Sequence, residues 1–292
     1  MRLTATTIPL MSEARTMIDA FERLDQMAES LDYALVGPAD SRVHEIRTRR
    51  FPFNTICHLG RDFGDGRWRS CSGVLIGPRR ILTAAHCLYS LKLGRAPVRV
   101  RVAPGRGDRD AFPYGTLLAT AAFVPHRFVD AQSQSERRSN DYGVLLLARP
   151  FRGLTRFLPL RALPDSVLRR IKEGGLLTVA GYPADRPLGT QWRHSERLRR
   201  FTPKRLLYTV DTCPGHSGSP VWTRLGEQRT LIGVHTSGIL DEKGRSYGCA
   251  KGTVLAPRGM MNSGVRINRN VLANLRDPLR RVGGARPMRR VL

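Results

Sequence analysis

Residues 211–220 read DTCPGHSGSP, and the interpretation of the whole chain depends on this stretch. Glycines stand on both sides of Ser217, at positions 215 and 218. Glycine permits tight backbone turns that expose a neighbouring side chain and direct amides toward it. A serine hydroxyl is a weak nucleophile until a general base removes its proton. The stretch is therefore either an ordinary hairpin turn or a turn that presents a nucleophile.

Two other stretches contain the partners that a nucleophilic serine needs. ILTAAHC places His86 directly after an apolar strand, and SNDYGVLLLARP places Asp141 directly before one. An acid in that position would accept the ring N–H of the histidine and stabilise its charged form. Alone, the histidine would more often be structural and the aspartate a turn residue. Together the three contexts predict a triad of His86, Asp141 and Ser217, with the amides of Gly215 and Ser217 as the oxyanion hole.

After Pro38, short apolar runs alternate with turn residues, which is typical of an all-β sandwich or barrel. Residues around 150–165 have the composition of a connection between two β units. A closing helix is expected at 268–276, and the final RRVGGARPMRRVL is interpreted as a disordered basic tail. The expected strands are TICHLG, SGVLIG, VRVRVAPG, YGVLLLARP, LLTVAGYP, RLLYTV, SPVW, TLIGVHTSG and KGTVLAPRG.

The composition limits the function classes. The chain has 49 basic and 24 acidic residues among 292, a formal net charge of +25. Such a charge suits nucleic acid, an anionic membrane surface or acidic polypeptides. The arginines are scattered, however, and no zinc-finger spacing or RNA-binding aromatic signature accompanies them, so we do not favour nucleic-acid or membrane binding. No apolar run reaches the length of about 18 residues that a membrane-spanning helix needs.

The N-terminal segment differs from the rest of the chain. Apolar residues from Met17 to Leu31 recur at helical spacing, which predicts a helix over about residues 12–34. Residues 1–34 hold three arginines against six acidic residues, a net charge of −3 ahead of a basic body. The segment is interpreted as a pro-segment or a permanent terminal helix. Acidic residues interrupt it before a signal-peptide core can form.

The chain resembles the chymotrypsin-like serine peptidases through SGVLIGPRRILTAAHC, NDYGVLLL and GHSGSP. The resemblance implies two six-stranded antiparallel β-barrels, a trypsin-like all-β fold with the site between them. We assign barrel 1 to about 45–150, barrel 2 to about 165–267, and a short C-terminal helix and basic tail to 268–292. It also implies an enzyme that hydrolyses polypeptides without a cofactor or a metal, and we expect a monomer.

A closer resemblance, to the bacterial glutamyl endopeptidases of the V8-like branch, extends over most of the chain after residue 36. Such enzymes commonly lose a pro-segment near the equivalent of Leu35 or Val36, so 1–35 is interpreted as a leader and 36–292 as the peptidase domain. The motifs that carry this resemblance are VGPADSRVHEIRTRRFPFNTICHL, VAPGRGDRDAFPYGT, AGYPADRPLGTQWRHS, DTCPGHSGSPVW and GVHTSG.

The same resemblance implies two disulfides and leaves one cysteine over. One bridge would join Cys71 and Cys87 behind the histidine, and the other Cys213 and Cys249 beside the specificity pocket. Cys57 would be a small buried residue. Two bridges favour a secreted or periplasmic protein, since disulfides persist in oxidising compartments.

Two predictions of specificity compete. In the glutamyl endopeptidases the residues matching Thr212 and His235 contact the substrate carboxylate, which implies cleavage after Glu or Asp. In the wider superfamily an acid six residues before the serine, here Asp211, selects Arg or Lys. His216 is expected at the rim of the site or in the turn. Thr236 is expected to brace Asp141.

Two further hypotheses keep the fold but change the function. The chain would be a catalytically silent binding module if the triad were not assembled. It would be a nucleic-acid or membrane-surface binder if the net charge were its main functional feature. The intact triad motifs favour the peptidase.

Overall fold

The computed structural model describes residues 35–36, 39–238, 249, 260–279 and 287–292. The helix expected over about 12–34 and the strand expected in KGTVLAPRG at 251–259 lie outside these residues.

The first barrel holds six antiparallel strands in the order β6-β5-β2-β3-β4-β7, and pairing between β6 and β7 closes it. Each strand also pairs with its neighbours in that order. Its strands are β2 (Ile56–Asp62), β3 (Trp68–Gly77), β4 (Arg80–Thr83), β5 (Arg99–Pro104), β6 (Leu117–Val124) and β7 (Gly143–Leu147).

The second barrel has the order β9-β10-β13-β12-β11-β8 and is closed by pairing between β8 and β9. The short strand β1 (Val43–His44) extends its sheet beside β9. The prediction of two six-stranded antiparallel barrels is confirmed. The strands of the second barrel are β8 (Leu176–Gly181), β9 (Trp192–Phe201), β10 (Arg205–Tyr208), β11 (Pro220–Leu225), β12 (Gln228–Ser237) and β13 (Asn262–Arg266).

A continuous apolar core joins the two barrels. Ile56 and Val74 of the first barrel belong to the same buried cluster as Trp222 and Val234 of the second. Full burial of side chains of this size contributes about 1.5–3 kcal/mol each. The barrels are therefore held as one unit, and loops from both can form a common site where they meet.

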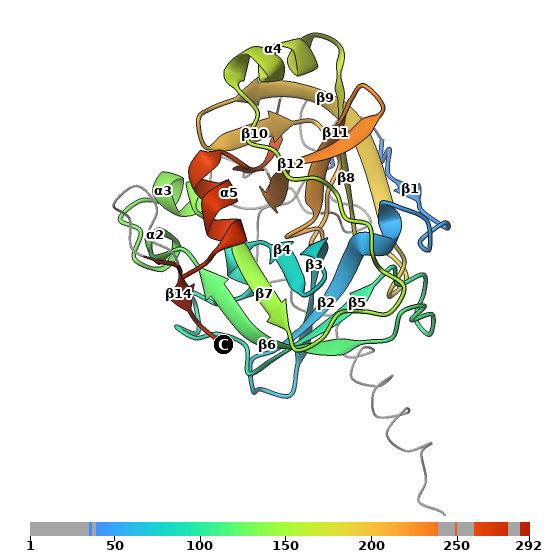
Figure 1. Ribbon diagram of the computed structural model, residues 1–292, viewed down its shortest axis with the longest axis vertical. Coiled ribbons are helices and arrows are strands. Elements are labelled where there is room, and N and C mark those ends of the chain that lie inside the picture. The colour runs from blue at the N-terminus through green and yellow to red at the C-terminus, as the bar shows by residue number, and fades with distance from the viewer. Residues whose placement is uncertain (1–34, 37–38, 239–248, 250–259, 280–286) are drawn as a thin grey trace, which may run out of the picture.

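Short helices cover the ends of the barrels (Figure 1). Helix α4 (Asp165–Gly174) packs Leu168 and Ile171 into the core of the second barrel. Helix α5 (Arg269–Arg276) matches the closing helix expected at 268–276, and the Asn268 side chain caps it by accepting from Val271 N at 3.0 Å. The remaining helical turns are η2 (Phe53–Thr55), η3 (Ala85–Cys87), α2 (His126–Val129) and α3 (Gln134–Ser139).

The expectation of a disordered tail is wrong for its last six residues. Strand β14 (Arg289–Arg290) pairs antiparallel with β6, and Val291 N donates to Ala122 O at 2.8 Å. Met288 is buried, and Val291 and Leu292 pack against the first barrel. These three apolar side chains bind the segment despite its arginines. The chain thus leaves the second barrel through α5 and ends on the first (Figure 1).

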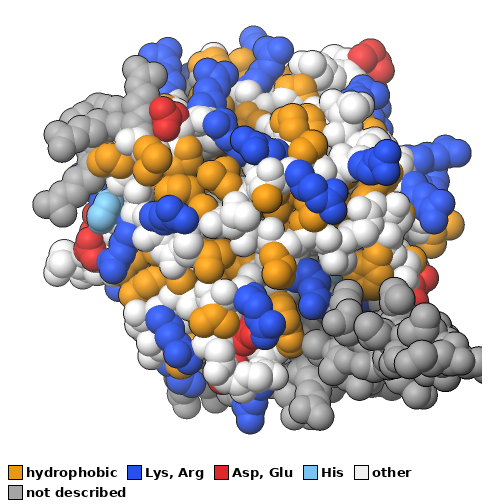
Figure 2. All heavy atoms as spheres, turned by 60° about the horizontal axis from the view of Figure 1, so that its bottom comes forward, with side chains coloured by type: hydrophobic (Ala, Val, Ile, Leu, Met, Phe, Trp, Pro, Cys, Tyr) orange, Lys and Arg blue, Asp and Glu red, His pale blue; other side chains and the backbone are white. Residues whose placement is uncertain are grey.

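Basic side chains are distributed over the surface. Figure 2 shows lysine and arginine side chains spread across one face, interspersed with apolar ones, rather than gathered into one patch. This distribution matches the scattered arginines of the sequence. None of the helices among the described residues has the length and apolar character required to cross a membrane.

Candidate active site

The loop between β10 and β11 carries Ser217, and its glycines are required by its shape. Gly215 and Gly218 have φ angles of 94° and 82°, in the left-handed region that side chains disfavour. A Cβ on Gly215 would collide with the carbonyl oxygen of Tyr182, and one on Gly218 with that of Ser72. The stretch is therefore packed tightly between the segment that follows β8 and Ser72 of the first barrel, and it is not an ordinary solvent-exposed turn.

The structure assembles the three predicted triad residues. His86 Nε2 lies 2.6 Å from Ser217 Oγ, and His86 Nδ1 lies 2.7 Å from Asp141 Oδ2. The backbone N–H of His86 donates to Asp141 Oδ1 at 3.0 Å, so both carboxylate oxygens hold the same residue. His86 lies in η3 after β4 and Asp141 just before β7, which are neighbouring strands of the first barrel. Ser217 comes from the second barrel.

The geometry fits general-base activation of the serine. Asp141 accepts a hydrogen bond from Nδ1–H of His86, which leaves the lone pair of Nε2 directed at the hydroxyl of Ser217. The backbone amides of Gly215 and Ser217 donate no hydrogen bond to any residue that the structure describes. They are available to the oxygen of a tetrahedral intermediate.

Ser72 of β3 fixes the nucleophile loop, and the sequence analysis did not identify it. Its hydroxyl donates to Gly215 O at 2.7 Å and accepts from Tyr182 N at 2.9 Å. Its own N–H donates to Ser217 O at 2.8 Å. These bonds cross from one barrel to the other, so the orientation of the Gly215 peptide depends on the first barrel. Nothing in the run SGVLIG indicates this role, because the partners of Ser72 are remote in sequence.

The disulfides are those that the resemblance implied. Cys71 pairs with Cys87 beside His86, and Cys213 pairs with Cys249. Cys71, His86 and Cys87 also lie close enough to resemble a metal-ligand group, but the two sulfurs are bonded to each other and are not thiolates. Cys57 is a buried thiol whose pKa is raised by burial.

His216 is buried within the turn rather than at the rim. It is 1% exposed, and its Nδ1 accepts the backbone N–H of Cys213 at 3.1 Å. Burial lowers the pKa of His216 to about 3, so the ring is neutral at physiological pH. Its contacts are those of a turn-stabilising residue.

Thr212 and His235, the residues predicted to contact a substrate carboxylate, are both fully buried. The hydroxyl of Thr212 has no hydrogen-bond partner among the described residues. His235 Nδ1 lies 2.8 Å from the hydroxyl of Tyr208. Burial lowers the pKa of His235 well below its usual range, so the imidazole is neutral. Tyr208 was not identified from the sequence.

Asp211 binds the segment that precedes the first barrel. Its Oδ1 accepts Val36 N at 2.6 Å and its Oδ2 accepts Ser41 N at 2.8 Å. The carboxylate is buried, and burial raises its pKa. Both oxygens are therefore engaged by backbone amides 170 or more residues away in the chain.

The expected contact between Thr236 and Asp141 is absent from the hydrogen bonds of the described residues. The hydroxyl of Thr236 lies 3.3 Å from that of Ser237. The backbone amide of His86 takes the second oxygen of Asp141 instead.

Comparison with known proteins agrees with the fold. The family model described as Trypsin matches residues 43–254. Glutamyl endopeptidase of Bacillus licheniformis is 30% identical over 242 residues, which cover 81% of this chain and 66% of that protein. The Bacillus subtilis protein named Extracellular metalloprotease is 27% identical over 254 residues, which cover 86% of this chain and 72% of that protein. Glutamyl endopeptidase of Staphylococcus epidermidis is 27% identical over 177 residues, which cover 60% of this chain and 56% of that protein.

Two solved structures share the fold. A Glu endopeptidase in complex with MPD superposes with a TM-score of 0.65 at 23% identity, covering 83% of this chain and 97% of that one. Protease Anisep from Arthrobacter nicotinovorans gives a TM-score of 0.51 at 16% identity, covering 77% and 92%. The match to the family model takes in the whole first barrel and five of the six strands of the second, and the triad is assembled between the barrels. This chain therefore belongs to the trypsin family of serine endopeptidases.

Proposed function

We propose that this protein hydrolyses peptide bonds after Glu or Asp through an acyl-enzyme. The observation that carries the chemistry is the alignment of Ser217, His86 and Asp141. Ser217 Oγ attacks the scissile carbonyl carbon while its proton passes to His86 Nε2. The resulting oxyanion accepts hydrogen bonds from the backbone N–H groups of Gly215 and Ser217. When the C–N bond breaks, Nε2 returns the proton to the leaving nitrogen. Water then attacks the ester with the same proton path and releases Ser217.

The preference for an acidic side chain is supported by the pair of Thr212 and His235. A hydroxyl and an imidazole N–H both donate hydrogen bonds to a carboxylate. When the Tyr208 hydroxyl donates to Nδ1 of His235, the ring hydrogen resides on Nε2, which then acts as a donor. A neutral His235 serves this purpose because donation requires only the N–H. Tyr208 would thus be a positioning residue for substrate recognition.

The contacts of Asp211 weigh against cleavage after Arg or Lys. A pocket that selects a cation needs a carboxylate directed at it. Here both oxygens of Asp211 accept the amides of Val36 and Ser41. We therefore assign Asp211 to the architecture of the N-terminal segment and not to the specificity pocket.

The specificity proposal predicts a defect confined to recognition in Tyr208→Phe. Loss of the hydroxyl removes the bond that sets the tautomer of His235, so kcat/KM for Glu substrates should fall about tenfold, mainly through KM. Cleavage of a peptide library by the wild-type enzyme, followed by steady-state kinetics on the best Glu peptide, measures this. Labelling by a small fluorophosphonate is the control, because it depends on the triad and not on the carboxylate site. Cuts after Arg or Lys in the library would contradict the proposal.

We also propose that residues 1–35 are a removable leader and that Asp211 receives the new N-terminus. Cleavage before Val36 converts its amide nitrogen into an ammonium group. That nitrogen already lies 2.6 Å from the buried carboxylate of Asp211. Ion pairing would offset the desolvation that raises the pKa of Asp211. The neighbouring Thr212 would be ordered at the same time.

This proposal predicts that the exact start of the chain matters. A form that begins at Val36 should have about tenfold higher kcat/KM than a form that begins at Leu35, because only the first places an ammonium group at Asp211. Asp211→Asn in both forms completes a double-mutant cycle, in which the difference should vanish. Equal activity of the two unsubstituted forms would refute the role of the N-terminus.

Secretion is the localisation that the features support best. The two disulfides require an oxidising compartment to form and persist. One relative, from Bacillus subtilis, carries the word extracellular in its name. We propose that the mature protein acts outside the cytoplasm.

A further inference from the structure

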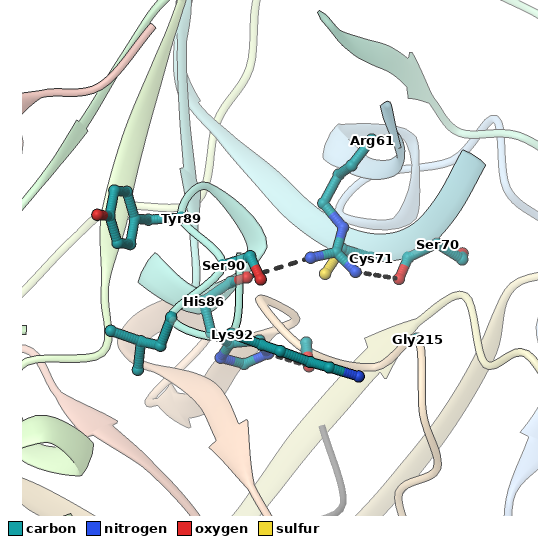
Figure 3. Close-up of a pocket in the computed structure, with 10 residues that line it drawn as sticks. Arg61, Ser70, Cys71, His86, Tyr89, Ser90, Lys92 and Gly215 are labelled. Atoms are coloured by element: carbon teal, nitrogen blue, oxygen red, sulfur yellow. Dashed lines mark hydrogen bonds between the residues drawn. The ribbon is translucent and has the colours of Figure 1, made fainter. Parts of the chain in front are cut away.

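A hollow of about 260 Å³ adjoins the triad on the side of the first barrel (Figure 3). Apart from Gly215 and Ser217, its walls come from β2, β3 and the segment that begins at His86 in η3 and runs on toward β5. The lining residues are Arg61, Ser70, Cys71, His86, Tyr89, Ser90, Leu91, Lys92, Gly215 and Ser217.

The position of the hollow relative to Ser217 indicates which half of a substrate it receives. Thr212 and His235, proposed above to hold the side chain before the cut, belong to the second barrel and do not line it. The leaving nitrogen takes its proton from His86 Nε2, so the chain that follows the cut departs on the histidine side. The hollow lies on that side and would hold the residues after the cut.

The hollow carries positive charge. Lys92 is exposed, and Figure 3 shows its side chain reaching across the hollow with its amino group toward Gly215. The guanidinium of Arg61 lies on another wall, where Nη1 donates to His86 O at 3.1 Å and Nη2 approaches Ser70 O at 3.5 Å. None of the lining residues is acidic. Buried on a wall, the charge of Arg61 is screened less by solvent than an exposed one.

The remaining lining suits a short side chain that ends in a charge. Leu91, Tyr89 and Cys71 of the Cys71–Cys87 disulfide offer apolar surface. The methylenes of Asp or Glu would contact this surface while the carboxylate meets Lys92. A basic side chain would instead bring a third positive charge into the same space, which is unfavourable.

We propose that this hollow selects an acidic side chain at the first or second position after the cut, with Lys92 as its main contact and Arg61 as a fixed source of positive potential. The proposal rests on the endopeptidase function above but not on the residue preferred before the cut. The protein would then favour acidic stretches of polypeptide and not single acidic residues.

Isosteric peptide pairs test the proposal. In both peptides of a pair, the residue before the cut is the one that the library shows to be cleaved best. The two peptides differ only at the first or the second position after the cut, where one has Asp and the other has Asn. Wild-type enzyme should cleave the Asp peptide with about threefold to fivefold higher kcat/KM at low salt, as expected for one exposed ion pair. The preference should decline as ionic strength rises. Mass spectrometry of the products confirms which bond was cut.

Three variants of Lys92 and one matched control identify the source of the preference. Lys92→Gln should bring the Asp to Asn ratio near one, Lys92→Glu should invert it, and Lys92→Arg should keep it. Arg95→Glu changes the charge equally in the same loop, but Arg95 is exposed and does not line the hollow. The Asp to Asn ratio of Arg95→Glu should therefore stay close to that of the wild type.

Two outcomes would overturn the proposal. An unchanged ratio in Lys92→Glu would exclude Lys92 as the contact. An equal loss in Arg95→Glu would attribute the preference to the overall charge of the protein. If the proposed endopeptidase function is wrong, no peptide in the library will be cleaved. If only the preference for Glu is wrong, the library will be cleaved after a different residue.

Discussion

Ser217→Ala is expected to lower kcat by about 10⁶-fold and to abolish labelling by a fluorophosphonate. The hydroxyl that lies 2.6 Å from His86 Nε2 is the atom that forms the acyl-enzyme, and no neighbouring group replaces it. The substitution removes one oxygen from a packed loop and leaves the φ angles of Gly215 and Gly218 undisturbed. The folded state should therefore persist, which circular dichroism and a melting curve can confirm.

The double variant Ser217→Ala/His86→Ala provides the control for this prediction. Because the two residues act as a unit, the second substitution should add little to the first. Residual cleavage by Ser217→Ala within tenfold of the wild type would mean that another group performs the attack. Labelling that persists in Ser217→Ala would place the nucleophile elsewhere.

Asp141→Asn is expected to lower kcat by about 10⁴-fold through the tautomer of His86. The backbone N–H of His86 points at Oδ1, so the amide oxygen of an asparagine would take that place. Its NH₂ group would then face Nδ1, which accepts only if its hydrogen moves to Nε2. An Nε2 that carries a hydrogen cannot accept the proton of Ser217. The geometry of the site would be preserved while its chemistry fails.

Kinetics and labelling together measure this effect. In Asp141→Asn the loss should appear in kcat, with KM changed little, because no substrate contact is removed. Asp141→Ala is the matched comparison, since it removes the carboxylate without forcing the wrong tautomer. A decrease in kcat of less than tenfold in Asp141→Asn would contradict the assignment of Asp141.

The triad could be predicted because each member lies in a distinctive local sequence. ILTAAHC, SNDYGV and GHSGSP each combine a reactive residue with small residues or an adjoining apolar strand. The disulfide pairs and the barrels followed from the resemblance that these motifs carry. Each of these motifs can be recognised in a short stretch of sequence, so the prediction required no knowledge of contacts between distant residues.

Other features depend on contacts between segments that are far apart in the chain, so they could not be predicted from short stretches of sequence. The carboxylate of Asp211 binds Val36, 175 residues away, and the hydroxyl of Ser72 binds Gly215, 143 residues away. From the sequence alone, Asp211 and Ser72 would each be compatible with several roles. The position of Tyr208 beside His235 likewise depends on two strands that both pair with β13.

Some strands were missed because their residues lack the expected pattern. Strand β9 reads WRHSERLRRF, and its arginines obscure the alternation of apolar and polar residues. Its residues 192–197 nevertheless pair with β8 and close the second barrel. The tail was misjudged for the same reason, since its arginines outnumber the three apolar residues that bind it to the first barrel.

The pairing of β14 with β6 has a consequence for a peptidase that is surrounded by copies of itself. A protein chain is cut most readily where it opens locally into an extended segment. Here the end of the chain is held in a sheet of the first barrel, while helix α5 just before it packs on the core that both barrels share. Met288, next to β14, belongs to the same shared core, so opening one barrel away from the other would expose its side chain as well. We expect the C-terminal arm to oppose such opening and so to slow autolysis.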